Sequence, residues 1–509
     1  MRDRPRAIEF PEPVAKTLLV LALTLAAVLR IWFAIHTHNT LEDSLITARY
    51  AENLVAGNGF VYNAGERILG TSTPLWTLLL AGGRIVCPFD IILLGKILGI
   101  AFSLLTLYLT FRALAGTSFL AAGIFAFFFA VNPDLIMVSS SGMETSLLLC
   151  SMSLAFVGWI EKTWLLPVGL AAVFLTRMDG LFFGGLLIVA GLFRDRQWYL
   201  RQGLATAALC APWLVFAFLY FGSVIPQTIV AKAAVYHLDR MSSAAPFLGT
   251  FTPMGEQSLI KSVVKGVLSI FLGTGLIAAA RSGLAYVALL AFFIVYCLSF
   301  MLSGGLIFSW YLAPPIFCST MFLALGLAWI VRAWFSTRRQ VAASAILTIL
   351  LCAVFLSLLP ARMSRYAELQ DFEDHVRKET GLWLKQNTEA GSRIFLEPIG
   401  YIGFYAGNDR VILDEVGLVT PQVMPFRKMG SGWYKGALDS LQPRYVVQYT
   451  YSLDHNATEG TGVPLFSNPS EREWFFAQYQ LIHEVKANRD YLQLAEKEKQ
   501  YSIFRRKIP

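Results

Sequence analysis

The chain has 509 residues, of which 56% are hydrophobic and only 15% are charged. This composition excludes an ordinary soluble globular protein, in which about a quarter of the residues are charged. The formal net charge is +8, but much of the positive charge lies in short segments between apolar runs. No pattern of basic and aromatic residues predicts nucleic-acid binding.

Apolar runs of about 14–20 residues recur through the first 360 positions, and each can form a membrane helix. The first contains Arg30 and is followed by no small-residue cleavage site, which predicts a permanent helix rather than a signal peptide. The runs are residues 17–35, 72–88, 91–111, 117–132, 144–160, 163–176, 180–193, 203–221, 262–280, 283–302, 306–331 and 341–359.

Basic residues between these runs predict the orientation, because cytoplasmic loops are enriched in Lys and Arg. Three clusters mark the cytoplasmic side: Arg2, Arg4, Arg6 and Lys16; Arg194, Arg196 and Arg201; Arg332, Arg338 and Arg339. One apolar run follows the third cluster, so the carboxyl-terminal segment is predicted to lie outside, which requires an odd number of crossings. Residues 72–88 contain Gly82, Gly83 and Arg84 and are therefore predicted to lie on the outer face. About eleven crossings remain, whether or not the short runs 163–176 and 180–193 are re-entrant.

The first outer loop, residues 36–90, is predicted to begin with an amphipathic helix. Its apolar residues recur at helical spacing, at Leu41, Leu45, Ile46, Tyr50 and Leu54. Glu42 and Asp43 occupy the first turn, and two compatible interpretations of this pair stay open. Thr40 and Asp43 resemble a capping box, which stabilises a helix start. Alternatively, a carboxylate at the membrane surface could act as a general base toward a hydroxyl.

The rest of this loop carries a series of motifs at fixed spacing: Ile46-Thr47-Ala48-Arg49-Tyr50, Asn53-Leu54, Asn63-Ala64-Gly65-Glu66-Arg67 and Pro74-Leu75-Trp76. Together with the acidic pair, they resemble the first outer loop of bacterial GT-C glycosyltransferases. The resemblance is closest to cell-wall arabinofuranosyltransferases, which use a polyprenyl-phosphate sugar donor, and to the glycosyltransferase 39-like membrane family. Glu42 departs from the usual aspartate, so the resemblance implies Asp43 as the catalytic base with Glu42 as its alternate. It also implies substrate contacts for Arg49, Tyr50, Glu66 and Arg67.

Six further polar or aromatic residues are predicted on the same outer face as Asp43: Glu144, Arg177, Asp179, Lys232, Trp310 and Tyr311. Charged groups at membrane depth are costly, so they are candidates for substrate binding. Each also has a structural interpretation. Glu144 could be a helix-start acid, Arg177 and Asp179 an ion pair, and Lys232 an interfacial anchor. Trp310 and Tyr311 could belong to an aromatic belt.

Residues 361–509 are more polar and predict a small soluble α/β domain. Residues 362–385 have a helical pattern, and residues 393–396, 410–413 and 444–447 are short strand-like runs. The six cysteines end at Cys352, so no disulfide is expected in this domain. It contains no phosphate-binding loop and no nucleophile motif, which indicates a scaffold or a contact with the acceptor.

The sequence therefore predicts an all-α polytopic membrane domain of the GT-C type, residues 1–360, followed by an extracytoplasmic α/β domain. The resemblance implies a glycosyltransferase of the bacterial inner membrane that moves a sugar from polyprenyl phosphate to a hydroxyl of a glycan or glycolipid, with inversion at the sugar. Two alternatives are a transporter or flippase of lipid-linked sugars, in which polar groups would lie near the bilayer midplane, and a non-catalytic scaffold that binds them. No metal site is predicted from Cys and His spacing, although the acidic pair could bind a divalent ion.

Overall fold

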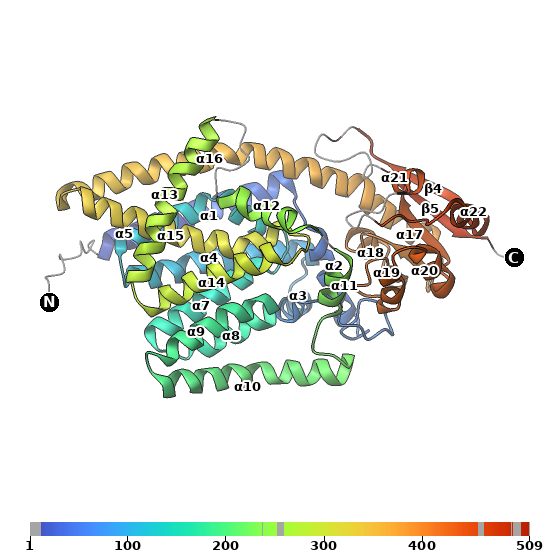
Figure 1. Ribbon diagram of the computed structural model, residues 1–509, viewed down its shortest axis with the longest axis horizontal. Helices are drawn as coiled ribbons and strands as arrows, with labels where there is room; N and C mark the ends of the chain where they lie inside the picture. Colours follow the sequence, from blue (N-terminus) through green and yellow to red (C-terminus); the bar gives the residue numbers. More distant parts are fainter. Residues whose placement is uncertain are drawn as a thin grey trace.

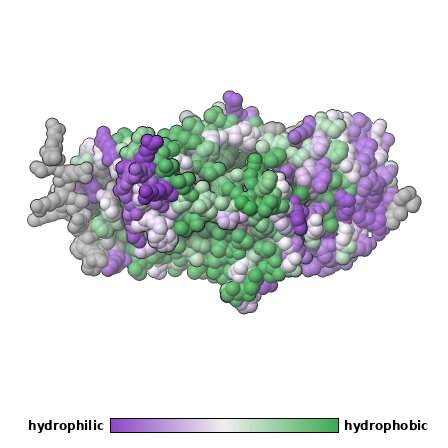
Figure 2. Space-filling model, turned by 90° about the horizontal axis from the view of Figure 1, so that it is seen from below, coloured by the Kyte–Doolittle hydropathy of each residue, from purple (hydrophilic) through white to green (hydrophobic). Residues whose placement is uncertain are grey.

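The computed structural model describes residues 12–236, 238–251, 259–456, 463–489, 491 and 500–507. The predictions on Arg2, Arg4 and Arg6 lie outside this range. The chain forms a long helical bundle with a small α/β domain at one end (Figure 1). Figure 2 shows hydrophobic side chains around the middle of the molecule and more hydrophilic ones toward both ends, the distribution expected of a protein that spans a membrane.

The bundle, called here the membrane domain, is built from apolar helices. They are α1 (Glu12–Thr37), α4 (Ile91–Ala115), α5 (Phe119–Val131), α6 (Pro133–Ser139), α7 (Thr145–Glu161), α8 (Leu165–Thr176), α9 (Leu181–Leu192), α10 (Arg196–Phe221), α13 (Leu259–Arg281), α14 (Leu284–Leu302), α15 (Ala313–Trp334) and α16 (Thr337–Phe372). Seven described helices are long and apolar enough to cross a membrane, or eight if the bent pair α5–α6 is one span. Shorter apolar helices accompany them, so the count of eleven crossings stays a prediction.

The bend between α5 and α6 is 64° and falls at Asn132-Pro133, where proline cannot donate a main-chain hydrogen bond. The carbonyls of Phe129 and Ala130 are satisfied by the buried guanidinium of Arg30, at 3.3 and 3.2 Å. The Arg30 side chain also donates to Ser103 Oγ at 2.8 Å. Arg30 in the first apolar run thus has a structural task, because polar main-chain groups within a bilayer must find protein partners.

Four shorter helices lie toward the end of the bundle that carries the α/β domain (Figure 1). They are α2 (Glu42–Val55), α3 (Pro74–Val86), α11 (Gln227–Val235) and α12 (Arg240–Phe251). The predicted capping box is wrong. The helix α2 starts after Leu41, which makes no side-chain cap, while the hydroxyl of Thr40 donates to the carbonyl of His38 at 3.2 Å. The apolar run 306–331 is also shorter than predicted as a helix, since α15 is preceded by the 3-10 turn η2 (Ser309–Leu312).

The carboxyl-terminal domain follows α16 without a break, through the π-helical turn η3 (Glu373–Lys378) and α17 (Glu379–Asn387). Its strands are β1 (Arg393–Leu396), β2 (Val411–Asp414), β3 (Tyr445–Tyr449), β4 (Tyr479–Lys486) and β5 (Gln500–Arg506). They form a sheet in the order β2-β1-β3-β5-β4. The domain also contains short helices: α18 (Tyr401–Tyr405), η4 (Pro421–Val423), α19 (Met424–Met429), α20 (Trp433–Leu441), α21 (Thr450–His455) and α22 (Pro469–Gln478). The last described element is the 3-10 turn η1 (Met178–Gly180), which lies between α8 and α9 in the membrane domain.

The carboxyl ends of β1, β2 and β3 lie next to the membrane domain. Strand β1 pairs in parallel with both β2 and β3, whereas β5 is antiparallel to β3 and β4. The chain leaves β1 toward β2 on one side and later returns to β3 on the other. Such a reversal opens a crevice at the carboxyl ends of the parallel strands, where α/β sheets usually bind ligands.

Candidate active site

A cavity of about 320 Å³ lies between the membrane domain and the carboxyl-terminal domain. We call it the interdomain cavity. Its membrane-domain wall comes from the start of α2, from α11 and from the segment before α15, and includes Asn39, Asp43, Lys232, Phe308 and Trp310. Its other wall comes from the end of α16, from η3 and from the carboxyl ends of β1, β2 and β3, and includes Gln370, Glu373, Arg377, Glu397, Asp414 and Tyr449.

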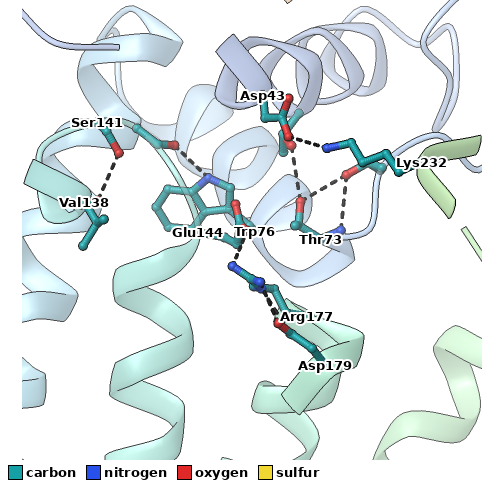
Figure 3. A network of polar contacts seen from close by, with 12 residues as sticks. Asp43, Thr73, Trp76, Val138, Ser141, Glu144, Arg177, Asp179 and Lys232 are labelled. Atoms are coloured by element: carbon teal, nitrogen blue, oxygen red, sulfur yellow. Dashed lines mark hydrogen bonds and ion pairs between the residues drawn. The ribbon is translucent and has the colours of Figure 1, made fainter. Parts of the chain in front are cut away.

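An ion pair joins two elements of the membrane-domain wall that are far apart in the sequence. The ammonium of Lys232 on α11 lies 2.9 Å from Asp43 Oδ2 on α2 (Figure 3). It also lies 4.8 and 5.9 Å from the ring centres of Phe308 and Trp310. Burial alone would lower the pKa of Lys232, but the Asp43 carboxylate raises it. The site therefore keeps a permanent cation next to a carboxylate.

A second charged cluster lies beside the first (Figure 3). Arg177 precedes η1, and its Nη2 contacts Asp179 Oδ2 at 2.6 Å. Its Nη1 lies 4.0 Å from Glu144 Oε1, and both side chains are only 6% exposed. This Nη1 has no hydrogen-bond partner among the described residues, although the guanidinium lies over the ring of Tyr311 at 4.8 Å. An unsatisfied donor on a buried cation is suited to an anionic group.

The motif around Glu144 is held by the first outer loop. Gly142 has a φ of +83°, a conformation that favours glycine, and its carbonyl accepts a hydrogen bond from Trp76 Nε1 at 3.1 Å. This bond ties the Pro74-Leu75-Trp76 motif to the turn that leads into α7. Nearby, the hydroxyls of Thr47, Thr71 and Thr73 form a chain with spacings of 3.3 and 3.1 Å. The bond from Trp76 in the first loop motif thus fixes the turn that precedes Glu144.

The two neighbouring acids Glu42 and Asp43 point to different partners. Whereas Asp43 faces Lys232, the Glu42 carboxylate accepts the main-chain N–H groups of Gly400 and Tyr401, the latter at 3.0 Å. Burial raises the pKa of Glu42, opposed by Arg377 and by these two N–H groups. The geometry leaves Asp43 as the acid with a displaceable cationic partner, and its catalytic role stays a prediction.

Four residues assigned to the substrate by resemblance do not line the described cavity. Arg49 is buried and donates to the carbonyls of Tyr62, Gly403 and Arg410, and the hydroxyl of Tyr50 bonds Ile68 O and Gly70 N. Glu66 accepts a hydrogen bond from Asn63 at 2.9 Å. Arg67 is exposed and lies over the ring of Tyr220 at 4.6 Å. These contacts stabilise the loop, and substrate contacts for the four residues stay a prediction.

The remaining predicted residues lie close together, and their contact with a substrate stays a prediction. Glu144, Arg177, Asp179, Lys232, Trp310 and Tyr311 are linked by the contacts above, and the rings of Trp310 and Tyr311 are 6.1 Å apart. The sequence analysis missed Tyr236, Glu373, Arg377, Glu397 and Tyr449. One signal was present, since Glu397 and Tyr449 lie at the ends of two predicted strands. Within the described ranges, no group of three or more His, Cys, Asp or Glu side chains is placed to hold a metal ion, and a divalent ion at the acidic pair stays a prediction.

The matching family model is a domain of unknown function, DUF8728, over residues 365–504. The chain is 28% identical over 259 residues to a terminal beta-(1->2)-arabinofuranosyltransferase of Mycobacterium tuberculosis, covering 46% of this chain and 41% of the relative. A Corynebacterium glutamicum protein of the same name is 27% identical over 233 residues, covering 38% and 33%. The chain therefore matches less than half the length of these curated relatives.

Two solved structures share the fold over most of the chain. ArnT from Cupriavidus metallidurans, bound to undecaprenyl phosphate, has a TM-score of 0.61 at 12% identity and covers 95% of this chain and 97% of its own. The oligosaccharyltransferase of Archaeoglobus fulgidus in its apo form has a TM-score of 0.59 at 14% identity, with 92% and 73% covered. Both are GT-C glycosyltransferases. The predicted GT-C fold, a multi-pass helical domain followed by a small α/β domain, is confirmed.

Proposed function

We propose that the chain is a membrane glycosyltransferase that transfers a sugar from a polyprenyl-phosphate donor to an acceptor hydroxyl. The observation that carries the proposal is the Asp43–Lys232 pair at 2.9 Å, on the wall of a cavity at the end of the membrane domain. A general base and a cation are what glycosyl transfer from a phosphate requires. The GT-C fold supports the same chemistry.

In the proposed reaction, Asp43 takes the proton of the acceptor hydroxyl while the hydroxyl oxygen attacks the anomeric carbon. The bond between that carbon and the phosphate oxygen breaks, and its electron pair leaves with polyprenyl phosphate. The sugar passes through an oxocarbenium-like state, as in glycoside hydrolysis. The Lys232 ammonium, 2.9 Å from the base, stabilises the charge that develops on the phosphate. In-line attack inverts the anomeric centre.

The donor phosphate is assigned to the zone between Lys232 and Arg177. Lys232 contacts the cavity from α11, and the buried Nη1 of Arg177 lacks a hydrogen-bond partner in the described structure. The aromatic side chains of Trp310 and Tyr311 lie between these two cations. The undecaprenyl phosphate bound to the C. metallidurans ArnT supports a lipid-phosphate donor. The names of the curated relatives support an arabinofuranosyl group as the sugar.

The location of the charged groups also argues against the transporter alternative. Transporters bind their substrates near the bilayer midplane, between inverted repeats. Here Asp43, Lys232, Glu144 and Arg177 lie close together (Figure 3), and the helices α2 and α11 lie where the bundle meets the carboxyl-terminal domain (Figure 1). We assign this end of the bundle to the outer face of the bacterial inner membrane, because the basic clusters at Arg194 and Arg332 lie at the other ends of α10 and α15.

The test is transfer by the purified full chain reconstituted into closed lipid vesicles. We expect undecaprenyl-phosphoryl arabinofuranose and a short arabinofuranose oligosaccharide to give a product longer by one sugar, detected by mass spectrometry. The Asp43→Asn variant is the matched control and should give almost none. Transfer from a nucleotide sugar without any lipid carrier would overturn the donor assignment. Movement of the lipid-linked sugar across the bilayer without transfer would favour a flippase.

A further inference from the structure

The two acids at the start of α2 make contacts with different domains. Asp43 pairs with Lys232 inside the membrane domain, whereas Glu42 reaches the carboxyl-terminal domain and accepts the N–H groups of Gly400 and Tyr401. Those two groups lie at the start of α18, directly after β1. The Glu42 carboxylate thus joins the turn that carries Asp43 to the edge of the sheet that forms the opposite cavity wall.

Further hydrogen bonds fix the same turn from the same side. The main-chain N–H of Thr40 donates to Gln370 Oε1 at 2.8 Å, and the hydroxyl of Tyr401 lies 3.2 Å from Thr40 O. Gln370 Nε2 in turn lies 3.0 Å from the Tyr401 hydroxyl. The two contacts of Thr40 thus join the residues just before α2 to the part of the chain after residue 365, and the bond between Gln370 and Tyr401 links these two partners to each other.

The approach at Gly400 leaves no room for a side chain. A Cβ placed on Gly400 would overlap the carbonyl oxygen and the carboxylate of Glu42. The φ of Gly400 is −67°, so glycine is needed there for space and not for backbone conformation. The contact between the two domains at Glu42 and Gly400 therefore depends on the absence of a side chain at Gly400.

The start of α2 needs external support. Helix termini leave main-chain N–H groups unsatisfied and tend to fray, and Leu41 gives this helix no side-chain cap. Asp43 is the second residue of the helix. If the turn frayed, the Asp43 carboxylate would move relative to Lys232, and a displacement of about 1 Å can reduce a rate by about 10²-fold.

We infer that Glu42 is a positioning residue, through which the domain of unknown function at residues 365–504 holds the Asp43 turn in its reactive geometry. The inference rests on the proposed function, because it takes Asp43 as the base. It assigns the carboxyl-terminal domain a direct part in the transfer step. It also gives the two adjacent acids separate tasks, one in chemistry and one in alignment.

The first test compares Glu42→Gln with Glu42→Ala in the transfer assay. Glutamine keeps the length and one acceptor oxygen, so we expect a kcat loss below about fivefold for Glu42→Gln and about 10–10²-fold for Glu42→Ala. The KM for the donor should stay within about threefold in both. If Glu42 were the base, the two variants would lose activity equally, since neither can accept a proton. Equal losses would overturn the inference.

The second test uses two alanine substitutions in α18 and its start. Gly400→Ala pushes against Glu42, whereas the matched control Gly403→Ala pushes against the hydroxyl of Tyr62 and not against Glu42. Hydrogen exchange of the α2 amides 44–47 should be faster in Gly400→Ala and unchanged in Gly403→Ala. Where Gly400→Ala does not fold, Glu42→Ala provides the same measurement.

Hydrogen exchange does not depend on catalysis, so the two proposals can fail separately. If the wild-type chain shows no transfer but the exchange pattern is as expected, the proposed function is wrong and the domain contact stands. If transfer occurs but exchange at residues 44–47 is the same in Gly400→Ala and Gly403→Ala, the positioning inference is wrong.

Discussion

The two walls of the interdomain cavity hold their charged groups in different ways. On the membrane-domain wall, Asp43 and Lys232 are paired with each other, and a substrate can exchange one charged partner for another. On the opposite wall, Asp414 accepts the main-chain N–H groups of Val416, Leu418 and Val419, while Glu373 is bonded to Arg377 at 2.6 Å. The second wall is thus held by bonds within its own domain, whereas the ion pair of the first wall is the one to which we assign the proposed chemistry.

This difference predicts whether replacing an acidic side chain of the cavity reduces activity or stability. Loss of a group on the membrane-domain wall should reduce transfer while leaving the fold intact, because the pair there is partly exposed. Loss of a group held by main-chain N–H donors should reduce stability first, because it leaves buried donors without partners. The following changes test this contrast, in order of decreasing effect.

The largest effect is expected for Asp43→Asn. A general base contributes about 10²–10⁴-fold to the rate, so kcat in the transfer assay should fall by that factor. The thermal midpoint should remain near that of the wild type, since no side chain, including that of Asp43, caps the start of α2. Retention of most activity by Asp43→Asn would remove it as the base and would leave the proposed mechanism without a proton acceptor.

A somewhat smaller effect is expected for Lys232→Met, which keeps the side-chain length and removes the charge. A group that stabilises developing negative charge contributes about 10²–10³-fold, and kcat should fall accordingly. Lys232→Arg keeps the cation and is the control, for which we expect partial activity. Equal activity of Met and Arg at this position would show that the cation merely anchors α11.

The carboxyl-terminal domain offers a test of stability against pH. Burial raises the pKa of Glu415 to about 8, so the folded chain keeps a proton that the unfolded chain loses as the pH rises from about 4.5. The free energy of unfolding therefore falls as the pH rises from about 4.5 to about 8, and at pH 7 the loss is about 3 kcal/mol. Glu415→Gln retains the oxygen that accepts from Gln448 Nε2 at 2.8 Å and removes the titration.

We expect Glu415→Gln to raise the thermal midpoint of the full chain in detergent more at pH 7 than at pH 5. Scanning calorimetry or intrinsic fluorescence at both pH values measures the difference. An equal shift at the two pH values would mean that the Glu415 carboxyl group does not titrate as its burial requires. Transfer at saturating substrate should change little, since Glu415 does not line the described interdomain cavity.

The smallest effect is expected for Arg67→Ala. Its guanidinium lies over Tyr220 on an exposed part of the loop, a contact that contributes about 0.5–1 kcal/mol. We expect kcat/KM for the donor to change less than about threefold. A drop beyond tenfold would place Arg67 in contact with the donor, as predicted from the sequence, and would extend the site beyond the interdomain cavity.

Much of this molecule was determined by local sequence pattern. The apolar runs predict the membrane helices, because a segment of that length and composition has few other stable states in a bilayer. The motifs from Glu42 to Trp76 resemble those of GT-C glycosyltransferases, and that resemblance implied the fold. The strand-like runs at 393–396, 410–413 and 444–447 correspond to β1, β2 and β3. These features depend on interactions within short stretches of chain.

Only the tertiary structure decided which acid and which cation work together. Lys232 and Asp43 are 189 residues apart, and Glu42 reaches Gly400 across 358 residues, so no local pattern could separate the two neighbouring acids. Local pattern instead favoured a capping box at Thr40, which the contact between Thr40 and Gln370 replaced. A hydrogen-bonding group takes the partner that folding brings within reach, and for the start of α2 that partner comes from the carboxyl-terminal domain.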